Sequence, residues 1–263
     1  MCGIFGIYEQ ESSQSKTDTF YKLGKYSESR GKEASGVCII ENNKTFVTKY
    51  SNKFSNSKVR NLLTKNKDSK NQTFVGHTRL ETSGSNKIFK NNQPIESENV
   101  IVLHNGIITN FQYLNEKYGF TENIELDSFV INELIEKNLD LSNLKKTILE
   151  SFKELYGEVS VFIYFKKLNL SVIYTNTGSI YYTTLNNKIS LFSSEEWITK
   201  KISKNKNINN LEPENGLIIN SNSEIIDSFK AKVDGDDRLP TLDKIRENLQ
   251  NQNYSEPQLE RCS

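Results

Sequence analysis

The chain has 263 residues and a mass of 30.2 kDa, which suits one large domain or two small ones with a sizeable core. Its 34 Lys and Arg nearly balance 33 Asp and Glu, and a net charge of +1 speaks against a strongly basic nucleic-acid-binding protein and against an acidic tail protein. Because of this charge balance, we expect no nucleic acid as a partner. No apolar run approaches the roughly 20 residues of a membrane-spanning helix, so we expect no membrane as a partner either.

Cysteine usage and the N-terminus indicate a reducing compartment. The opening residues MCGIFGIYEQ carry no basic segment and turn polar after Tyr8, so we expect no signal peptide. Three cysteines (Cys2, Cys38 and Cys262) are too few, and odd in number, for a disulfide framework. We therefore expect a cytoplasmic protein.

Metal and nucleotide motifs are absent from the sequence. The two histidines, His77 and His104, show no zinc-ligand spacing with the cysteines or with each other. Neither a P-loop nor a glycine-rich dinucleotide turn is present. We expect no metal and no cofactor.

The first hundred residues alternate short apolar segments with amphipathic ones. Residues 2–8 form an apolar run too short for a helix, which predicts a buried strand beginning at the terminus. The pattern then predicts a helix over residues 17–29 and a hairpin of two strands, 36–40 and 45–50, with a polar turn at 42–44. A short helix over 59–65 and a strand over 72–80 follow. A polar stretch follows over residues 82–98, and loops of this length inside a domain are usually functional or disordered.

The rest of the chain begins with the apolar run Val100–Leu103, which predicts a buried strand ending abruptly at His104-Asn105-Gly106. Helices are predicted over residues 111–118, 128–137, 144–156 and 195–202, and strands over 159–165, 170–175, 179–184, 189–193, 216–220 and 224–229. Two batches of strands with interleaved helices favour two packed sheets covered by helices, although the pattern leaves other α+β arrangements open. Residues 231–263 are expected to form a polar C-terminal tail with one amphipathic segment at 239–249.

Cys2 is the first residue that could carry chemistry. Removal of Met1 would leave Cys2 with a free α-amine, whose reference pKa near 7.7–8.0 lets it accept a proton from the thiol. A nucleophile and a base would then lie in one residue, which needs no histidine. A cysteine in such a position is more often only a small hydrophobic residue at the start of a buried strand, so Cys2 alone is weak evidence of chemistry.

Two further segments carry polar groups at strand ends. Arg79, in Gly76-His77-Thr78-Arg79, could clamp a carboxylate bidentately, although many such arginines only form surface ion pairs. In Asn105-Gly106, the side-chain amide and a backbone N–H could form a two-donor oxyanion hole. The same pair is also a common tight-turn sequence.

Asp127 opens a predicted helix as Asp-Ser-Phe-Val. Most aspartates in this position are N-caps and nothing more. Each of these signals is weak singly, but their order along the chain is specific.

In this order, the segments resemble the glutaminase domain of class II (N-terminal nucleophile) glutamine amidotransferases. The likeness is greatest to that domain of glutamine–fructose-6-phosphate aminotransferase, with some likeness to the purine-pathway amidophosphoribosyltransferase. The matching pieces are MCGIFGI, Arg30-Gly31 with Ala34-Ser35-Gly36, GHTRLETSG, Asn92-Gln93-Pro94, VLHNGIITNF, Glu125-Leu126-Asp127 and Leu211-Glu212. The resemblance implies a glutaminase domain over residues 2–230, followed by the tail at 231–263.

The resemblance also implies a four-layer αββα sandwich of the N-terminal nucleophile hydrolase type, and a role for each matching residue. Cys2 would be the nucleophile, its α-amine the base, and Asn105 and Gly106 the oxyanion donors. The substrate-binding set would be Arg79 for the α-carboxylate, Asp127 for the α-ammonium, Thr82 and the Leu80 backbone lining the site, and Arg30 near the nucleophile in a less defined role. The two histidines would be structural.

Several positions depart from the family pattern. Leu80, Glu81 and Ser83 replace the usual residues after the arginine, and Lys32-Glu33 replace those after Arg30-Gly31. These changes leave the residues for glutamine chemistry intact and affect the loop that would close the site and couple it to an acceptor site. The family's sugar-isomerising, phosphoribosyl or ATP-binding halves are not found in the sequence.

The favoured hypothesis is therefore a glutaminase subunit that hydrolyses L-glutamine through a Cys2 thioester. It would pass ammonia to a separate synthase acting on an acceptor such as a sugar phosphate or nucleotide sugar. A hydrolase of another γ-glutamyl amide is an alternative, although Arg79 and Asp127 together would read both ends of a free amino acid. An inert regulatory or scaffolding relative is a second alternative, against which retention of the whole reacting set argues.

Overall fold

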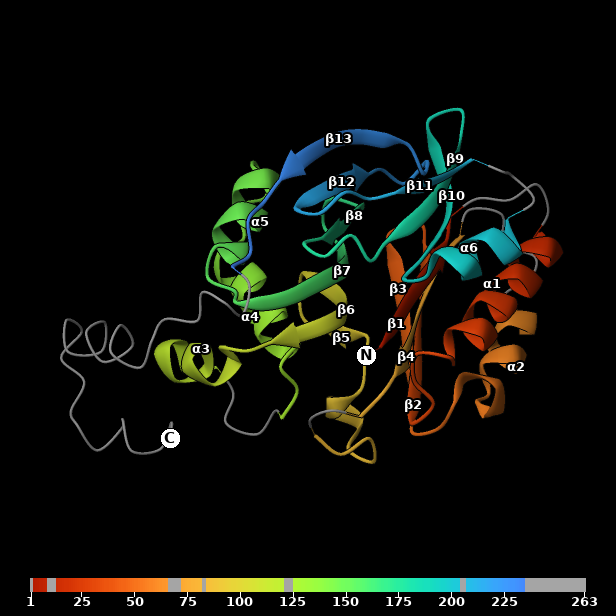
Figure 1. Cartoon of the computed structure of the whole chain (residues 1–263), viewed down its shortest axis with the longest axis horizontal. Coiled ribbons are helices and arrows are strands. Elements are labelled where there is room, and N and C mark those ends of the chain that lie inside the picture. Colours follow the sequence, from red (N-terminus) through yellow and green to blue (C-terminus); the bar gives the residue numbers. More distant parts are fainter. Residues whose placement is uncertain are drawn as a thin grey trace.

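The computed structural model describes residues 2–8, 13–65, 72–81, 84–120, 125–203 and 207–234. These residues form four layers, in which two antiparallel sheets pack face to face and each outer face is covered by helices (Figure 1). The predicted αββα sandwich is confirmed. The expected domain boundary at residue 230 stays a prediction, and the amphipathic segment at 239–249 lies outside the described residues.

The first sheet has β1 at its centre. Its strand order is β11-β9-β10-β1-β4-β2-β3, and its strands are β1 (Gly3–Ile7), β2 (Ala34–Glu41), β3 (Lys44–Tyr50), β4 (Gln72–Arg79), β9 (Tyr181–Leu185), β10 (Lys188–Ser193) and β11 (Ile208–Asn210). All five residues of β1 are buried, as its apolar sequence predicts. β1 pairs antiparallel with β4, with Gly3 opposite Thr78. The N-terminal end of β1 therefore lies beside the C-terminal end of β4.

The second sheet is built around β6 and β7. Its order is β13-β12-β8-β7-β6-β5, and its strands are β5 (Ile95–Glu96), β6 (Val100–Ile108), β7 (Gly157–Phe165), β8 (Leu170–Thr175), β12 (Asn215–Ile219) and β13 (Ile225–Lys230). β6 pairs with β7 from Val100 opposite Phe165 to Ile108 opposite Gly157. The prediction that this strand ends at His104-Asn105-Gly106 is therefore wrong, because β7 supplies partners as far as Ile108 and the Asn-Gly pair forms no turn.

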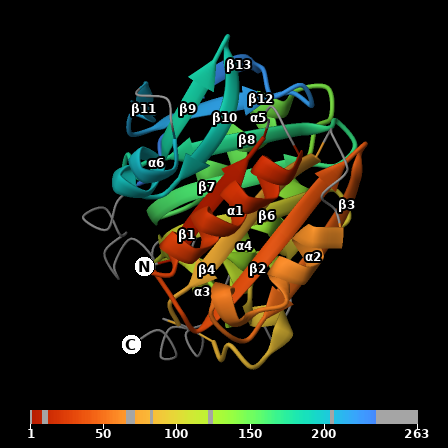
Figure 2. The same ribbon diagram turned by 90° about the vertical axis from the view of Figure 1, so that its right-hand side faces the viewer.

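The helices are α1 (Ser13–Ser27), α2 (Val59–Lys65), α3 (Phe111–Tyr118), α4 (Phe129–Lys137), α5 (Leu144–Phe152) and α6 (Glu196–Ile202), with short 3-10 turns at Phe54–Asn56 and Phe89–Asn91. α1, α2 and α6 cover the first sheet, and α3, α4 and α5 lie against the second (Figures 1 and 2). Both α2 and α3 have the predicted bounds, whereas α5 ends four residues earlier than the predicted 156.

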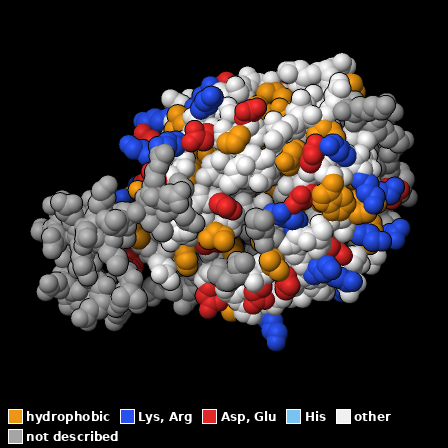
Figure 3. Space-filling view, in the orientation of Figure 1, with side chains coloured by type: hydrophobic (Ala, Val, Ile, Leu, Met, Phe, Trp, Pro, Cys, Tyr) orange, Lys and Arg blue, Asp and Glu red, His pale blue; other side chains and the backbone are white. Residues whose placement is uncertain are grey.

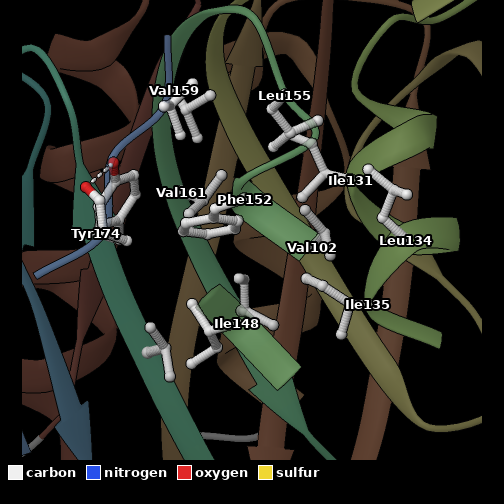
Figure 4. Close-up of a cluster of buried hydrophobic side chains, with 14 of the residues drawn as sticks. Val102, Ile131, Leu134, Ile135, Ile148, Phe152, Leu155, Val159, Val161 and Tyr174 are labelled. Carbon is white, nitrogen blue, oxygen red and sulfur yellow. Dashed lines mark hydrogen bonds between the residues drawn. The ribbon is translucent and has the colours of Figure 1, made fainter. Parts of the chain in front are cut away.

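Three hydrophobic clusters hold the four layers together, one at each interface. The first joins α4 and α5 to the second sheet and includes Phe152, Ile131 and Val161 (Figure 4). The cluster between the sheets includes Ile4, Val75 and Leu103. The third packs Phe5 with Phe20 and other side chains of the outer helices. Fully burying one such side chain contributes about 1.5–3 kcal/mol, so each interface adds substantially to stability.

The surface in Figure 3 carries charged side chains of both signs, interspersed with scattered hydrophobic ones. No helix in the described part of the chain is long and apolar enough to span a membrane. No large single-sign patch is visible on this face, in keeping with the balanced composition.

Candidate active site

The predicted reacting residues project from the inner faces of the two sheets. Side chains alternate between faces along a strand, so residues two or four apart share a face. Ile4 and Val75 belong to the core between the sheets, which assigns Cys2 and Arg79 to the same inner face. Leu103 is also in that core, so Asn105 faces the first sheet from the second. The alternation of side chains along the strands therefore directs Cys2, Arg79 and Asn105 into the space between the two sheets.

A hydrogen bond between the sheets joins the C-terminal part of β4 to the middle of β6. The His77 ring Nε2 and the His104 carbonyl oxygen are 3.1 Å apart, and both residues are buried. Arg79 and Asn105 follow these histidines by two and one residues. The C-terminal end of β4 and the middle of β6 thus meet at the end of the sandwich where β1 begins (Figure 1).

Cys2 lies at this junction, one residue before β1. Its thiol Sγ donates to the Leu80 carbonyl oxygen at 3.7 Å, and its own carbonyl oxygen accepts from Arg30 Nε at 3.1 Å. Arg30 also forms an ion pair with Glu195. The structure therefore places Arg30 against the Cys2 backbone. Burial raises the pKa of the Cys2 thiol, which keeps it protonated at neutral pH, so a reaction at sulfur requires a base.

Arg79 is almost completely buried and is anchored by the following loop. Its Nη1 donates to Asn92 Oδ1 at 2.9 Å, and its Nη2 donates to the Gly84 carbonyl oxygen at 2.6 Å. The Arg79 charge favours the Cys2 thiolate, whereas the Asp127 charge disfavours it. A cation and an anion thus act on the same sulfur. Thr82, predicted to line the site, lies outside the described residues.

Asp127 is held by donors from two elements. Its Oδ2 accepts from the Ile108 N–H at 2.8 Å, and its Oδ1 accepts from Ser128 N at 2.7 Å and from Ser128 Oγ at 3.2 Å. The side chain therefore ties the start of α4 to β6. Asp127 is not the N-cap that its position in the sequence suggests, because Ser128 is the N-cap of α4. Three acceptor sites are used, which leaves a carboxylate with capacity for one more donor.

The Asn105 side chain is 4% exposed, and its Oδ1 has no hydrogen-bond partner among the described residues. A buried amide without partners costs about 1–3 kcal/mol per unsatisfied group. Such groups are retained where a ligand completes them. Asn105 is therefore suited to bind a polar atom within the site.

The Gly106 backbone offers an N–H donor next to Asn105. Val159 lies opposite Gly106 on β7. Its N–H donates to Asn176 Oδ1 at 2.7 Å, and its carbonyl oxygen accepts from Asn176 N at 2.9 Å. Since Val159 faces β8, it does not exchange ladder hydrogen bonds with Gly106. β5 does not extend this far, because its pairing with β6 ends at Val102.

Two neighbouring N–H groups on the same edge of β6 are occupied. His104 N donates to Gln93 Oε1 at 2.6 Å, and Ile108 N donates to Asp127 Oδ2. The Gly106 N–H between them has no partner within the described part of the chain. Its φ is +150°, and a Cβ built there would lie 1.9 Å from the Glu158 carbonyl oxygen, so only glycine fits.

Both histidines are buried and bonded within the protein. His104 Nδ1 lies 2.7 Å from Ser128 Oγ, and its Nε2 lies 3.0 Å from the Glu158 carbonyl oxygen. Burial lowers the pKa of His104, and it lowers the pKa of His77 to about 3. Both imidazoles are thus neutral at physiological pH and order the site's backbone.

Asn92, Gln93 and Ser128 are the site residues to which the sequence assigned no role. Asn92 anchors Arg79, whereas Gln93 Nε2 donates to the His104 carbonyl oxygen at 3.1 Å and to Ser128 Oγ at 3.2 Å. The sequence signal for two of them is the segment Asn92-Gln93-Pro94, which matches the family but does not by itself indicate what either side chain contacts.

Comparisons with known proteins show the family to which this chain belongs. The profile of the family described as "Glutamine amidotransferase domain" matches residues 77–199. The glutamine–fructose-6-phosphate aminotransferase of Buchnera aphidicola subsp. Baizongia pistaciae is 32% identical over 212 residues, covering 78% of this chain and 33% of that protein. The corresponding protein of Sulfolobus acidocaldarius is 28% identical over 268 residues, covering 97% of this chain and 43% of that protein. The chain thus spans less than half the length of these relatives.

Two solved structures show the same fold. The glutamine phosphoribosylpyrophosphate amidotransferase of B. subtilis has a TM-score of 0.67 and 22% identity, covering 87% of this chain and 49% of that one. A structure described as the allosteric regulatory enzyme of purine biosynthesis has a TM-score of 0.69, 22% identity and the same coverage of 87% and 49%.

Proposed function

Since the chain contains a class II glutamine amidotransferase domain, we propose that it hydrolyses L-glutamine to L-glutamate and ammonia through a thioester at Cys2. The observation that carries the proposal is the position of two potential donors beside Cys2: the Asn105 side-chain amide, on the face of β6 that looks toward Cys2, and the Gly106 N–H, unpaired among the described residues, on the adjoining edge of the strand. Two such groups beside a nucleophile fit an oxyanion hole.

In the first half-reaction, the Cys2 sulfur attacks the side-chain amide carbon of glutamine. The thiol proton passes to the Cys2 α-amine, which must be free, so the mechanism requires removal of Met1. The carbonyl oxygen becomes an oxyanion that accepts from the Asn105 amide and the Gly106 N–H. The protonated α-amine then gives its proton to the leaving nitrogen, the C–N bond breaks, and ammonia departs from a glutamyl thioester.

In the second half-reaction, water attacks the thioester carbonyl carbon. The α-amine takes a proton from that water, and the same two donors stabilise the second tetrahedral intermediate. Cleavage of the C–S bond releases glutamate, and the proton returns to the sulfur. The raised pKa of the Cys2 thiol makes the neutral thiol the resting form, which assigns the base a role in both steps.

Arg79 and Asp127 account for the choice of a free amino acid. Their opposite charges both act on the Cys2 sulfur, which suits the α-carboxylate and α-ammonium of a zwitterion. Arg30 would position Cys2 through its backbone carbonyl rather than contact substrate. Leu80 and Thr82 would line the site, with the Leu80 carbonyl orienting the thiol.

We further propose that the ammonia serves a synthase carried on a separate protein; the names of the relatives, glutamine–fructose-6-phosphate aminotransferases, support transfer of the ammonia to an acceptor. The relatives named for fructose-6-phosphate suggest a sugar phosphate or nucleotide sugar as the acceptor. Free thiols at Cys2 and Cys38 suit the reducing cytoplasm, where we place the reaction.

The test is glutamate release from L-glutamine by the purified chain and by two matched cysteine variants. Cys2→Ala should abolish the activity, whereas Cys38→Ala, which alters a buried core thiol, should retain it if the variant is folded. Circular dichroism and thermal melting establish that both variants fold. Glutamate release by Cys2→Ala at the wild-type rate would remove Cys2 from the mechanism.

A further inference from the structure

The segment between β10 and α6 lies against the first residues of β1. β1 and β10 pair antiparallel, with Phe5 opposite Ser193, so β10 ends beside the N-terminal end of β1. Ser194 follows directly: the Ile4 N–H donates to Ser194 Oγ at 2.8 Å, and the Ile4 carbonyl oxygen accepts from Ser194 N at 2.9 Å and from Ser194 Oγ at 3.0 Å. Ser194 therefore holds both backbone groups of Ile4, two residues after Cys2.

Glu195, the next residue, is the N-cap of α6, yet its side chain forms no capping hydrogen bond within the described residues 195–203. Glutamate is also not among the residues preferred at an N-cap, which are Ser, Thr, Asp and Asn. The Glu195 carboxylate instead forms an ion pair with Arg30, and the Arg30 and Glu195 side chains are 16% and 26% exposed. The Glu195 side chain is thus used for a contact with another element rather than for its own helix.

Arg30 connects this ion pair to the nucleophile. Its Nη1 pairs with Glu195, and its Nε donates to the Cys2 carbonyl oxygen at 3.1 Å. Because the guanidinium is planar and rigid, a contact at one nitrogen fixes the direction of the other donors. The Cys2 carbonyl belongs to the peptide group that joins Cys2 to β1, so its direction determines where the Cys2 thiol and α-amine point.

Gly31 connects Arg30 to the second partner of Cys2. A Cβ on Gly31 would lie 2.1 Å from the Arg79 carbonyl carbon and 2.2 Å from Leu80 N, so the backbone at Gly31 packs directly against the 79–80 peptide group. The Leu80 carbonyl oxygen accepts from the Cys2 thiol at 3.7 Å. A displacement of Arg30 would therefore disturb both the carbonyl contact and the thiol contact of Cys2.

We propose that Glu195 is a positioning residue for Cys2, acting through Arg30, and that the segment Ser194–Glu195 holds the nucleophile in its reactive direction. This inference rests on the proposed hydrolysis of glutamine at Cys2. The Glu195 carboxylate contacts Arg30 and not the reacting atoms, so its loss lowers turnover without weakening glutamine binding. A misplacement of about 1 Å can cost about 10² in rate, and a partial loss of order at Cys2 should cost about tenfold or more.

The kinetic test compares neighbouring glutamates. Glu195→Ala should lower kcat for glutamate release by about tenfold or more with little change in KM. Glu196→Ala is the matched control, because Glu196 is exposed and pairs with Lys200 one turn along α6, and it should behave as wild type. Glu195→Gln keeps an acceptor oxygen for Arg30 and should recover part of the rate. Thermal melting establishes that the variants fold, and a wild-type kcat in Glu195→Ala would overturn the proposal.

A double-mutant cycle tests whether Glu195 acts through Arg30. Arg30→Met keeps most of the side-chain stem and removes the guanidinium. In the Arg30→Met background, Glu195→Ala should cause no further loss of kcat, because the group that it orients is already absent. The same fractional loss in both backgrounds would show that Glu195 acts independently of Arg30 and would overturn the proposal.

The direction of the Cys2 carbonyl can be measured without any activity. Cys2-Gly3 is the one Cys-Gly pair in the sequence, so protein labelled with carbonyl-¹³C cysteine and ¹⁵N glycine gives a single carbonyl–amide signal by NMR. Glu195→Ala should move the Cys2 carbonyl shift towards its value in Arg30→Met, whereas Glu196→Ala should leave it unchanged.

The NMR and kinetic results separate the two proposals. An unmoved Cys2 signal in Glu195→Ala would overturn the positioning role, even in a chain that hydrolyses glutamine. A moved signal in a chain whose wild type releases no glutamate would refute the proposed function and confirm the contact through Arg30.

Discussion

Lowering the pH from 7.5 to 5.5 should destabilise the fold through His77. The imidazole is completely buried between β4 and β6, and its burial lowers its pKa from 6.5 to about 3. In the unfolded chain the same group takes up a proton near pH 6.5. Between pH 6.5 and 3 the unfolded state therefore binds more protons than the native state, so the free energy of unfolding falls as the pH falls through this window.

The magnitude follows from the two pKa values. Protonation with an unfolded pKa of 6.5 stabilises the unfolded state by about 1.4 kcal/mol more at pH 5.5 than at pH 7.5, since the native imidazole stays neutral at both. The assay is urea denaturation at the two pH values for wild type and for His77→Gln, which keeps a donor for the His104 carbonyl. Wild type should lose about 1.4 kcal/mol more than the variant.

His104 provides the internal control for this comparison. Burial lowers its pKa too, but it is present in both proteins, so the difference between the two proteins isolates His77. If wild type and His77→Gln lost equal stability between pH 7.5 and 5.5, His77 would not be neutral and buried as the structure has it, and the reasoning would be refuted.

Two kinetic predictions follow from the candidate active site. Asn105→Ala should lower kcat by about 10²–10³ with a small change in KM, because an oxyanion donor acts mainly in the transition state. A steady-state assay of glutamate release measures both constants. A raised KM at unchanged kcat would assign Asn105 to substrate binding instead. Arg79→Lys should raise KM strongly with a smaller effect on kcat, since a lysine cannot form the bidentate contact with a carboxylate; the same assay checks it, and an unchanged KM would remove Arg79 from carboxylate recognition.

The sequence predicted the layered fold where periodicity and local turn chemistry act alone. The apolar run at the N-terminus became the buried centre strand β1, and the asparagine turn at 42–43 became the β2–β3 hairpin. Both depend on short-range preferences that a sequence displays directly. Cys2 and Arg79 could be recognised as candidate site residues from local sequence too, because each stands at the end of an apolar strand.

The sequence could not predict features that arise from long-range pairing. Asn105-Gly106 is a typical turn dipeptide, yet it lies within β6, because β7 extends far enough to pair with it. The roles of Asn92 and Gln93 depend on contacts with Arg79 and His104, which only the packing of the two sheets creates. The free N–H at Gly106 can be recognised only once it is known that Val159, opposite it, bonds to Asn176 instead.

The measurement that tests the central claim most directly is covalent labelling of the purified protein with a glutamine analogue that carries a diazoketone. Intact-mass spectrometry and peptide mapping should show loss of Met1, one adduct per chain, its position at Cys2, and protection by L-glutamine. An adduct at Cys38 or Cys262, or full glutaminase activity in protein that retains Met1, would contradict an N-terminal cysteine nucleophile.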